Sequence, residues 1–268
     1  TIIPSSRTQV IQNLEGGILA EILVHEGDIV EAGDVLVRIE NTVAKASLED
    51  ARSQYLTLLA TEARLVAEIE GLDKPDFPIS VLNEAPTVAS DQLRLFNARK
   101  RQLDAQISVL KSQAQQRKQE VAEMNSRLRQ LEQSLSLARE ELAITSPLVQ
   151  KGVMPRIELI RIERQVADLE GEIRTIRTAI PRLQAAQQEA NQRIDEMRLT
   201  AETEASNELN STRAELKSIS QSLFAGEDRV TRTAVTSPVR GTVKDMKINT
   251  VGGVIQPGED IMEIVPLD

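Results

Sequence analysis

The sequence contains no cysteine, no tryptophan and a single histidine, and its aromatic residues amount to one tyrosine and three phenylalanines. Without cysteine the chain can form neither a disulfide nor a thiolate metal site. The one histidine, His25, excludes most histidine-based metal clusters and argues against a His-dependent catalytic triad. Aromatic side chains commonly fill wide cores. Their scarcity therefore argues against an ordinary globule.

The sequence also lacks any run of about 18 apolar residues, so no segment of it is expected to span a bilayer as a helix. A net charge of −9 argues against an electrostatic grip on nucleic acid. The chain begins at Thr1 and has no signal peptide, so we expect it to be a fragment of a longer protein. Ala, Leu, Ile, Glu, Gln and Arg dominate the composition, which is typical of long helices and coiled coils.

Residues 8–41 have the pattern of β-strands. The stretches TQVIQNL, GILAEILV and DVLVRIE are short, apolar and rich in β-branched residues, and glycine-containing turns separate them. Gly27 and Gly33 each precede an aspartate, and we expect these turns to use the conformational freedom of glycine. These strands make up only half of a small β domain, which could not bury its own apolar face.

Residues 42–228 are helical in pattern. Apolar residues recur in steps of three and four over three helices, at about 42–71, 89–144 and 156–226, and this spacing predicts coiled-coil packing. Prolines predict a connector at 73–88, and Pro147, Gly152 and Pro155 predict a turn at 145–155. Gly226 is expected to end the last helix.

The helix lengths predict an antiparallel hairpin whose turn, residues 145–155, is its tip. In this arrangement the first two helices stack end to end against the third. Pro181 lies inside the third helix and is expected to bend it.

Residues 229–266 return to a β pattern and repeat the first half. Gly17 matches Gly241 at an offset of 224 residues, and Gly33 matches Gly258 at an offset of 225. Gly253 and Gly258 are the expected turn glycines of this second half. The apolar positions of the two halves should face each other in a two-layer sandwich. The predicted class is therefore α+β, with a long coiled-coil hairpin of three helices inserted between two halves of one sandwich.

Two such halves resemble the biotinyl/lipoyl fold. Three segments together resemble the haemolysin D family of periplasmic adaptors, or membrane fusion proteins, of type I secretion. They are VIQNLEGGILAEILVHEGDIVEAGDVLVRIE, SPLVQKGVMPRIELIRIERQVADLEGEI and SPVRGTVKDMKINTVGGVIQPGEDIMEIVPLD. They occur in the family's order, and the resemblance extends over essentially the whole chain.

The resemblance implies an adaptor that joins an inner-membrane ABC transporter to a TolC-like outer-membrane channel, for export of a protein substrate. It implies a periplasmic location, an inner-membrane anchor before this segment, a β-barrel domain after it, and a homo-hexameric assembly. The wider class often carries an Arg, a Leu and a Ser or Thr at the tip. Here the three positions hold Ile144, Leu148 and Pro155. Docking is therefore expected to use the tip residues Leu148, Gly152, Val153, Met154 and Pro155.

Several residues allow a functional interpretation that we weigh against a simpler one. Lys247 resembles the modified lysine of biotin carriers, but that lysine lies at the turn joining the halves, so we expect an unmodified strand lysine here. His25 is expected to be a solvated strand-end residue rather than a pH sensor. The carboxylates near the first two turns could bind a cation or form a solvated rim, and we favour the rim; they are Glu26, Asp28, Glu31 and Asp34.

The tip region is also basic, through Lys151, Arg156, Arg161 and Arg164. These cations either form a solvated helix start or steer the tip toward an acidic channel mouth. No pattern supports catalysis, a metal site or a bound cofactor. The stretch GVIQPG is not followed by the lysine and the hydroxyl-bearing residue that a phosphate loop needs.

The predicted function is thus a non-enzymatic export adaptor. Three alternatives stay open at this point. The same architecture could serve a drug-efflux pump, although the long hairpin and the QNLEGG segment favour type I secretion. A biotinyl or lipoyl carrier domain is disfavoured because the lysine turn is split. A purely structural coiled coil would leave the repeated β halves unexplained.

Overall fold

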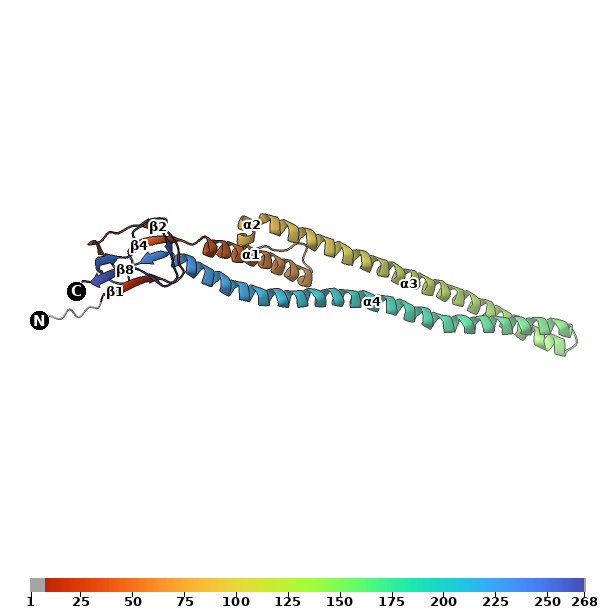
Figure 1. Cartoon of the computed structure of the whole chain (residues 1–268). Helices are drawn as coiled ribbons and strands as arrows, with labels where there is room; N and C mark the ends of the chain where they lie inside the picture. Colours follow the sequence, from red (N-terminus) through yellow and green to blue (C-terminus); the bar gives the residue numbers. More distant parts are fainter. Residues whose placement is uncertain (1–7, 268) are drawn as a thin grey trace. The chain divides into compact units, whose positions relative to one another are not determined.

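A computed structural model describes residues 8–267 of the chain, which form two compact units. The sandwich unit comprises residues 8–94 and 206–267, and contains all the strands together with the helical segments nearest to them. The hairpin unit comprises residues 95–205. Figure 1 shows the elements of both units along the chain.

The β-sandwich is assembled from both ends of the described chain. Its strands are β1 (Gln9–Asn13), β2 (Gly17–Ile22), β3 (Ile29–Val30), β4 (Val35–Glu40), β5 (Ala234–Thr236), β6 (Gly241–Met246), β7 (Val254–Ile255) and β8 (Glu259–Pro266). They form two antiparallel four-stranded sheets, with the orders β1-β8-β6-β3 and β5-β4-β2-β7. Four of the six strand pairings join one half to the other. Red strands therefore lie beside blue ones in Figure 1.

The two sheets enclose an aliphatic core. Leu19 and Leu36 from the first half, and Ile261 and Ile264 from the second, are 0% exposed. Burying one such side chain contributes roughly 1.5–3 kcal/mol. Because these side chains pack in one cluster, neither half can bury its apolar face without the other. The predicted sandwich of two separated halves is confirmed.

The internal repeat extends to individual backbone hydrogen bonds. The Gly33 N–H donates to the Ser237 carbonyl at 2.8 Å, and the Gly258 N–H donates to the Asn13 carbonyl at 2.7 Å. Position 237 follows position 13 by 224 residues, and position 258 follows position 33 by 225. Each half thus gives the other the same bond, and the sandwich has approximate two-fold symmetry.

The acidic residues of the turns also follow the internal repeat, because each accepts a backbone N–H within its own turn. The Asp34 carboxylate accepts the Glu31 backbone N–H at 2.8 Å. At the equivalent place in the second half, the Glu259 carboxylate accepts the Gln256 N–H at 2.7 Å. These side chains close their own turns, which is a common use of acidic residues in turns.

The glycine positions of the turns differ from the prediction in one case. Gly27, Gly33 and Gly258 adopt positive φ angles of 92°, 96° and 80°, as a glycine turn requires. In the remaining turn Gly252, at φ 88°, takes this role and Gly253 does not. The offset of 225 relates Gly252 to Gly27, whereas Gly253 corresponds to Asp28.

The helices are α1 (Thr42–Glu70), α2 (Ile79–Glu84), α3 (Pro86–Gln150) and α4 (Arg156–Thr231). The short helix α2 lies in the stretch predicted to be a connector. Helix α3 begins three residues earlier than predicted, with Pro86 in the first position, where the missing N–H of proline costs nothing.

Two predicted helix ends are wrong for identifiable reasons. Helix α3 continues through Pro147 to Gln150, because one proline removes only one donor. The last turn keeps its acceptors paired: the Pro147 carbonyl accepts the Lys151 N–H at 3.2 Å, and the Leu148 carbonyl accepts the Val153 N–H at 3.0 Å. Helix α4 continues past Gly226 to Thr231. A Cβ at Gly226 would lie 3.2 Å from Leu48 Cδ1, so this glycine permits close packing of α4 on α1.

The predicted end-to-end stacking of the first two long helices is also wrong. Gly71 ends α1 in a left-handed conformation, with φ 66°, and the chain then doubles back. Arg52 of α1 forms an ion pair with Glu84 at 2.7 Å. Further along α1, Arg64 bonds to Gln92 of α3. Helix α1 therefore lies beside α2 and the first turns of α3.

Arg64 is a buried charge at the centre of this three-helix region. Its side chain is 1% exposed. The guanidinium donates to Gln92 of α3 at 2.7 Å, and to Glu68 of α1 and Glu208 of α4 at 2.6 Å each. A charge this deeply buried is tolerated only when its hydrogen bonds are satisfied. Arg64 thus favours the one arrangement in which all three helices supply acceptors.

The hairpin unit is an antiparallel pair formed by parts of α3 and α4. Arg139 pairs with Glu170 at 2.6 Å, and Arg177 pairs with Glu132 at 2.7 Å, so the two helices are aligned in one register. Exposed ion pairs of this kind contribute at most about 1 kcal/mol each. The apolar seam supplies most of the stability; its buried residues include Ile107, Ala114, Leu135, Ala138, Ile162, Ile173, Ile176, Ile180, Ala190 and Ile194.

We predict that Arg64→Ala will lower the free energy of unfolding by on the order of 3 kcal/mol, because two carboxylates and an amide lose a buried partner. Urea unfolding followed by circular dichroism measures the change. Arg213→Ala is the matched control, since it removes an exposed ion pair between Arg213 of α4 and Glu62 of α1. It should cost less than about 1 kcal/mol. Equal losses in the two variants would contradict the assigned role of Arg64.

Candidate docking site at the hairpin tip

The tip of the hairpin is a tight turn with a defined hydrogen-bond pattern. Gly152 has φ 72°. Its N–H donates to the Val149 carbonyl at 3.0 Å, and the next N–H, of Val153, donates to the Leu148 carbonyl at 3.0 Å. These two bonds form a Schellman motif, in which a left-handed glycine closes the end of a helix. The tip backbone is therefore held in one conformation before any partner binds.

The five residues predicted for docking lie together at this turn but differ in exposure. Val153 is 69% exposed. Gly152 and Pro155 are also exposed, whereas Leu148 and Met154 are half-buried. Of the five, Val153 is therefore the large apolar side chain most accessible to a partner.

Three further apolar residues near the tip were not predicted as contacts. Ile144 at the end of α3 is 61% exposed, and Ile157 and Ile160 in the first turns of α4 are 71% and 49% exposed. Ile157 and Ile160 are three residues apart and share one face of α4. The sequence contains a signal for this exposure. These β-branched residues fall outside the heptad seam that contains Ile162, so the packing of α3 against α4 does not bury them. We call Ile144, Val153, Ile157 and Ile160 the tip patch.

The cations near the tip patch divide into paired and unpaired residues. Arg161 donates to Glu158 at 2.6 Å and lies 3.6 Å from Glu141. The hydrogen bond to Glu158 raises the pKa of Arg161 above its usual value, and the charge of the same residue adds to the effect. Within residues 8–267 no carboxylate lies within ion-pair distance of a second set of cations, Lys151, Arg156 and Arg164. These cations remain available to an acidic partner.

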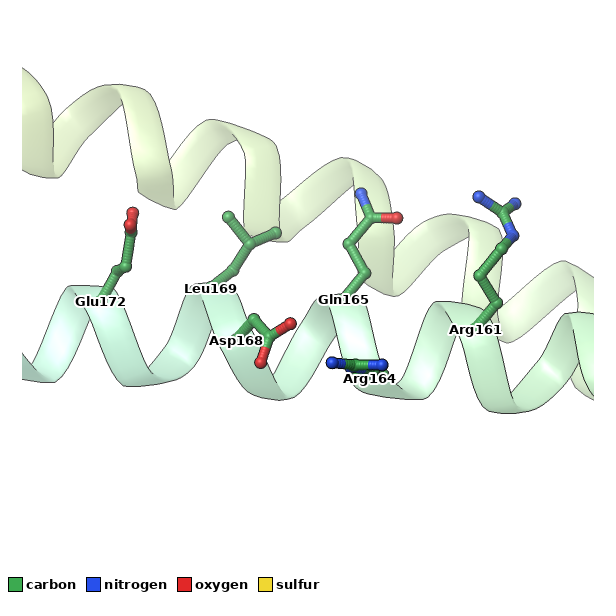
Figure 2. A pocket seen from close by; sticks show the side chains of 6 residues that line it. All are labelled: Arg161, Arg164, Gln165, Asp168, Leu169 and Glu172. Atoms are coloured by element: carbon green, nitrogen blue, oxygen red, sulfur yellow. The ribbon is translucent and has the colours of Figure 1, made fainter.

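A shallow depression follows the tip patch along α4. It is lined by Arg161, Arg164, Gln165, Asp168, Leu169 and Glu172. Figure 2 shows Gln165, Leu169 and Glu172 rising from α4 toward α3, while Arg164 and Asp168 lie across the outer face of α4. The depression is an open surface groove, which suits contact with another protein better than enclosure of a small molecule.

The residues considered for cation binding or modification have other contacts. The Asp28 carboxylate accepts the backbone N–H of His25 at 2.8 Å. Glu31 forms an ion pair with Arg240 at 3.1 Å. Lys247 follows β6, and its ammonium lies 3.6 Å from the Asp260 carboxylate.

Glu26 accepts the Met246 N–H at 3.0 Å. His25 is a largely exposed residue whose side chain lies 3.7 Å from Asp28. Across the described part of the chain, no group of three or more His, Asp or Glu residues is arranged to hold a metal ion. None of the helices in residues 8–267 carries an apolar stretch long enough to cross a lipid bilayer.

Comparisons with known proteins place the whole chain in one family. The family model of the AprE long α-helical hairpin matches residues 44–229. The crystal structure of the soluble domain of LipC, a membrane fusion protein of a type I secretion system, superposes with a TM-score of 0.91. The two are 30% identical, over 97% of this chain and 100% of that chain. The chain belongs to the AprE family of membrane fusion proteins.

Curated relatives of this family agree. The type I secretion system membrane fusion protein PrsE of Rhizobium meliloti is 32% identical over 270 residues, which cover 99% of this chain and 62% of PrsE. The chromosomal haemolysin secretion protein D of Escherichia coli is 22% identical, over 98% of this chain and 57% of that protein. The resemblance to the haemolysin D family is thereby confirmed. The chain spans about three fifths of the length of these relatives.

We predict that Gly152→Ala will lower the unfolding temperature of this AprE-family hairpin, because the left-handed conformation costs about 1–2 kcal/mol for a residue with a Cβ. No atom lies within 4 Å of the added Cβ, so the effect is purely one of backbone conformation. Gly171→Ala is the matched control: Gly171 lies inside α4, and its added Cβ also meets nothing within 4 Å.

The control should raise the unfolding temperature, because alanine favours a helix interior over glycine by roughly 0.5–1 kcal/mol. Thermal unfolding followed by circular dichroism compares the two variants. An unfolding temperature that Gly152→Ala leaves unchanged or raises, as Gly171→Ala does, would show that the tip does not require the left-handed conformation.

Proposed function

We propose that the protein is a non-enzymatic periplasmic adaptor of type I protein secretion, whose hairpin tip docks on a TolC-like outer-membrane channel. Its other partner is an inner-membrane ABC transporter, and the exported protein passes through the assembly. The observation that carries this proposal is the tip patch: four exposed aliphatic side chains around a rigid turn in a chain of this family. Exposed apolar clusters of this kind commonly mark protein contacts.

The chemistry of the tip fits a helical partner with an apolar groove and an acidic rim. Val153 and Ile157 would supply the buried centre of the contact, where most of the binding free energy of an interface arises. The unpaired Lys151, Arg156 and Arg164 would attract carboxylates at its edge. Such rim charges mainly raise the rate and the specificity of association. The preformed Schellman turn lowers the entropy cost of docking.

The other parts of the proposal come from the family. We propose that the full-length protein is anchored in the inner membrane, that it assembles as a hexamer, and that the sandwich domains pack side by side in that assembly. The family relationship supports these features, because LipC and PrsE are membrane fusion proteins of type I secretion systems. In this arrangement the adaptor works by geometry: the sandwich sets the direction of the arm, and the tip makes the contact.

In the full-length protein, a single cysteine at Val153 should form a thiol-specific cross-link to the outer-membrane channel in secreting cells. The described sequence has no cysteine of its own, so the introduced thiol is the only one in this segment. Lys118→Cys is the matched control, since Lys118 is exposed on α3 away from the tip. Capture of the channel by position 118 but not by position 153 would refute docking through the tip.

We also predict that Ile157→Glu will reduce secretion of the exported protein strongly, because a carboxylate at the centre of an apolar contact costs at least about 2 kcal/mol, or roughly thirtyfold in affinity. Leu199→Glu is the matched control. Leu199 also lies on α4 and is 64% exposed, compared with 71% for Ile157. Secretion per cell and adaptor abundance are measured together, and similar secretion from the two variants would exclude Ile157 from the contact.

A further inference from the structure

One short turn of the sandwich contacts both places where the helical arm is attached. The turn is Asn13–Gly17, with the sequence NLEGG, and we call it the NLEGG turn. The arm begins at Thr42, where α1 starts, and ends at Thr231, where α4 stops. All of these residues lie in the sandwich unit.

The NLEGG turn holds the end of α4 through two side chains. Asn13 is 3% exposed, and its amide nitrogen donates to the Arg232 carbonyl at 3.1 Å. Glu15 pairs with the Arg232 guanidinium at 2.9 Å, and Arg229 lies 3.8 Å from the same carboxylate. The backbone just after α4 and two arginines at its end are thus tied to one turn.

The same turn holds the start of α1. The Asn41 side-chain amide donates to the Gly16 carbonyl at 3.2 Å. The oxygen of the same amide accepts the Ala44 N–H at 2.9 Å and caps α1. One side chain therefore both caps the helix and ties it to the turn, so a rotation of α1 about its first residue would break at least one of these bonds.

The turn itself is fixed to the sandwich. The Asn13 side-chain oxygen accepts the N–H groups of Glu15 and Gly16 at 2.9 and 2.7 Å. Gly16 has φ 65°, and a Cβ there would lie 2.7 Å from the Ile255 carbonyl oxygen. The Asn13 carbonyl accepts the Gly258 N–H. The contacts to the arm therefore start from a rigid platform.

The approximate symmetry of the sandwich separates the role of Asn13 in the sandwich from its role toward the arm. Its equivalent in the second half is Ser237, which is 2% exposed and also accepts a turn glycine N–H with its backbone carbonyl. The Ser237 hydroxyl donates to the Val239 carbonyl, within its own turn. At the equivalent place the sandwich thus accepts a serine. The longer asparagine closes its own turn and also adds the bond to the end of α4.

We propose that the NLEGG turn is a joint that fixes the direction in which the helical arm leaves the sandwich, and that Asn13 is its central positioning residue. The joint acts on both attachment points at once, so the arm is held at two places instead of swinging on one. Glu15 adds a charged tie on the α4 side. This inference concerns the sandwich unit alone and does not depend on docking at the tip.

The experiment uses a pair of spin labels on cysteines placed at Ile29 of β3 and Lys217 of α4, both exposed positions in the sandwich unit. Double electron–electron resonance measures the distribution of distances between them. Asn13→Ser installs the residue of the symmetric position. It removes the bond to Arg232 and the two bonds that the asparagine oxygen accepts within its own turn, whereas Glu15→Gln leaves those turn bonds in place. We expect Asn13→Ser to broaden the distribution about twofold, because local hydrogen bonds that restrict opening are lost. Glu15→Gln, which weakens the ion pairs, should broaden it in the same direction.

Ser237→Ala is the matched control. It removes a buried hydroxyl whose hydrogen bond, to the Val239 carbonyl, lies within its own turn, so the distribution should keep its width. Hydrogen exchange of the sandwich amides in each variant checks that the sheets remain intact. The joint is disproved if Asn13→Ser and Glu15→Gln both leave the width unchanged, or if Ser237→Ala broadens it as much as Asn13→Ser does.

Discussion

The structure depends on the pairing of two half-domains that cannot fold separately. Four of the six strand pairings, and the cluster around Leu19 and Ile264, require both halves at once. A flexible insertion of this length would oppose that pairing with a loop-closure entropy that grows with the logarithm of its length. The antiparallel hairpin removes most of this cost, because its own packing returns the chain to its starting point. The arm and the sandwich therefore stabilise each other.

The sandwich unit and the hairpin unit use different devices for specificity. In the sandwich, the turn glycines and the repeated backbone hydrogen bonds allow only one register of strand pairing. The hairpin has a more permissive seam of aliphatic residues in steps of three and four, and this pattern alone would accept several alignments. Polar groups restrict it: Arg64 at the three-helix region, and the pairs of Arg139 and Arg177 along the two-helix part. Such groups contribute more to the choice of one arrangement than to stability.

Much of this fold follows from periodicity in the sequence, whereas the features that were not predicted depend on contacts between elements and on exposed positions. The repeat at offsets of 224 and 225 and the heptad steps predict the split sandwich and the long helices, because each reports a buried face. Two features hold α1 beside α2 and the start of α3: the buried charge of Arg64, and an apolar cluster of Leu56, Ala60, Val81 and Ala89. The apolar spacing within one helix does not say which helix will cover it. Gly226 does not end α4, because glycine serves both helix ends and close packing, and the contact with Leu48 shows that it serves packing here. At the tip, the heptad pattern predicts buried positions only, and Ile157 and Ile160 are exposed residues outside it.

The approximate symmetry of the sandwich offers a way to separate residues that serve the fold from residues that serve the arm. Where the two halves agree, as at Gly33 and Gly258, the shared feature is one that the sandwich requires of both. Where the two halves carry different residues at equivalent positions, the sandwich itself accepts either residue. A contact outside the sandwich must then account for the difference. Asn13 and Ser237 differ at the place where the arm joins, and the extra reach of the asparagine amide ends on the last turn of the arm. An insertion in one connection of a symmetric domain must break the symmetry there, because only that connection has helix ends to hold.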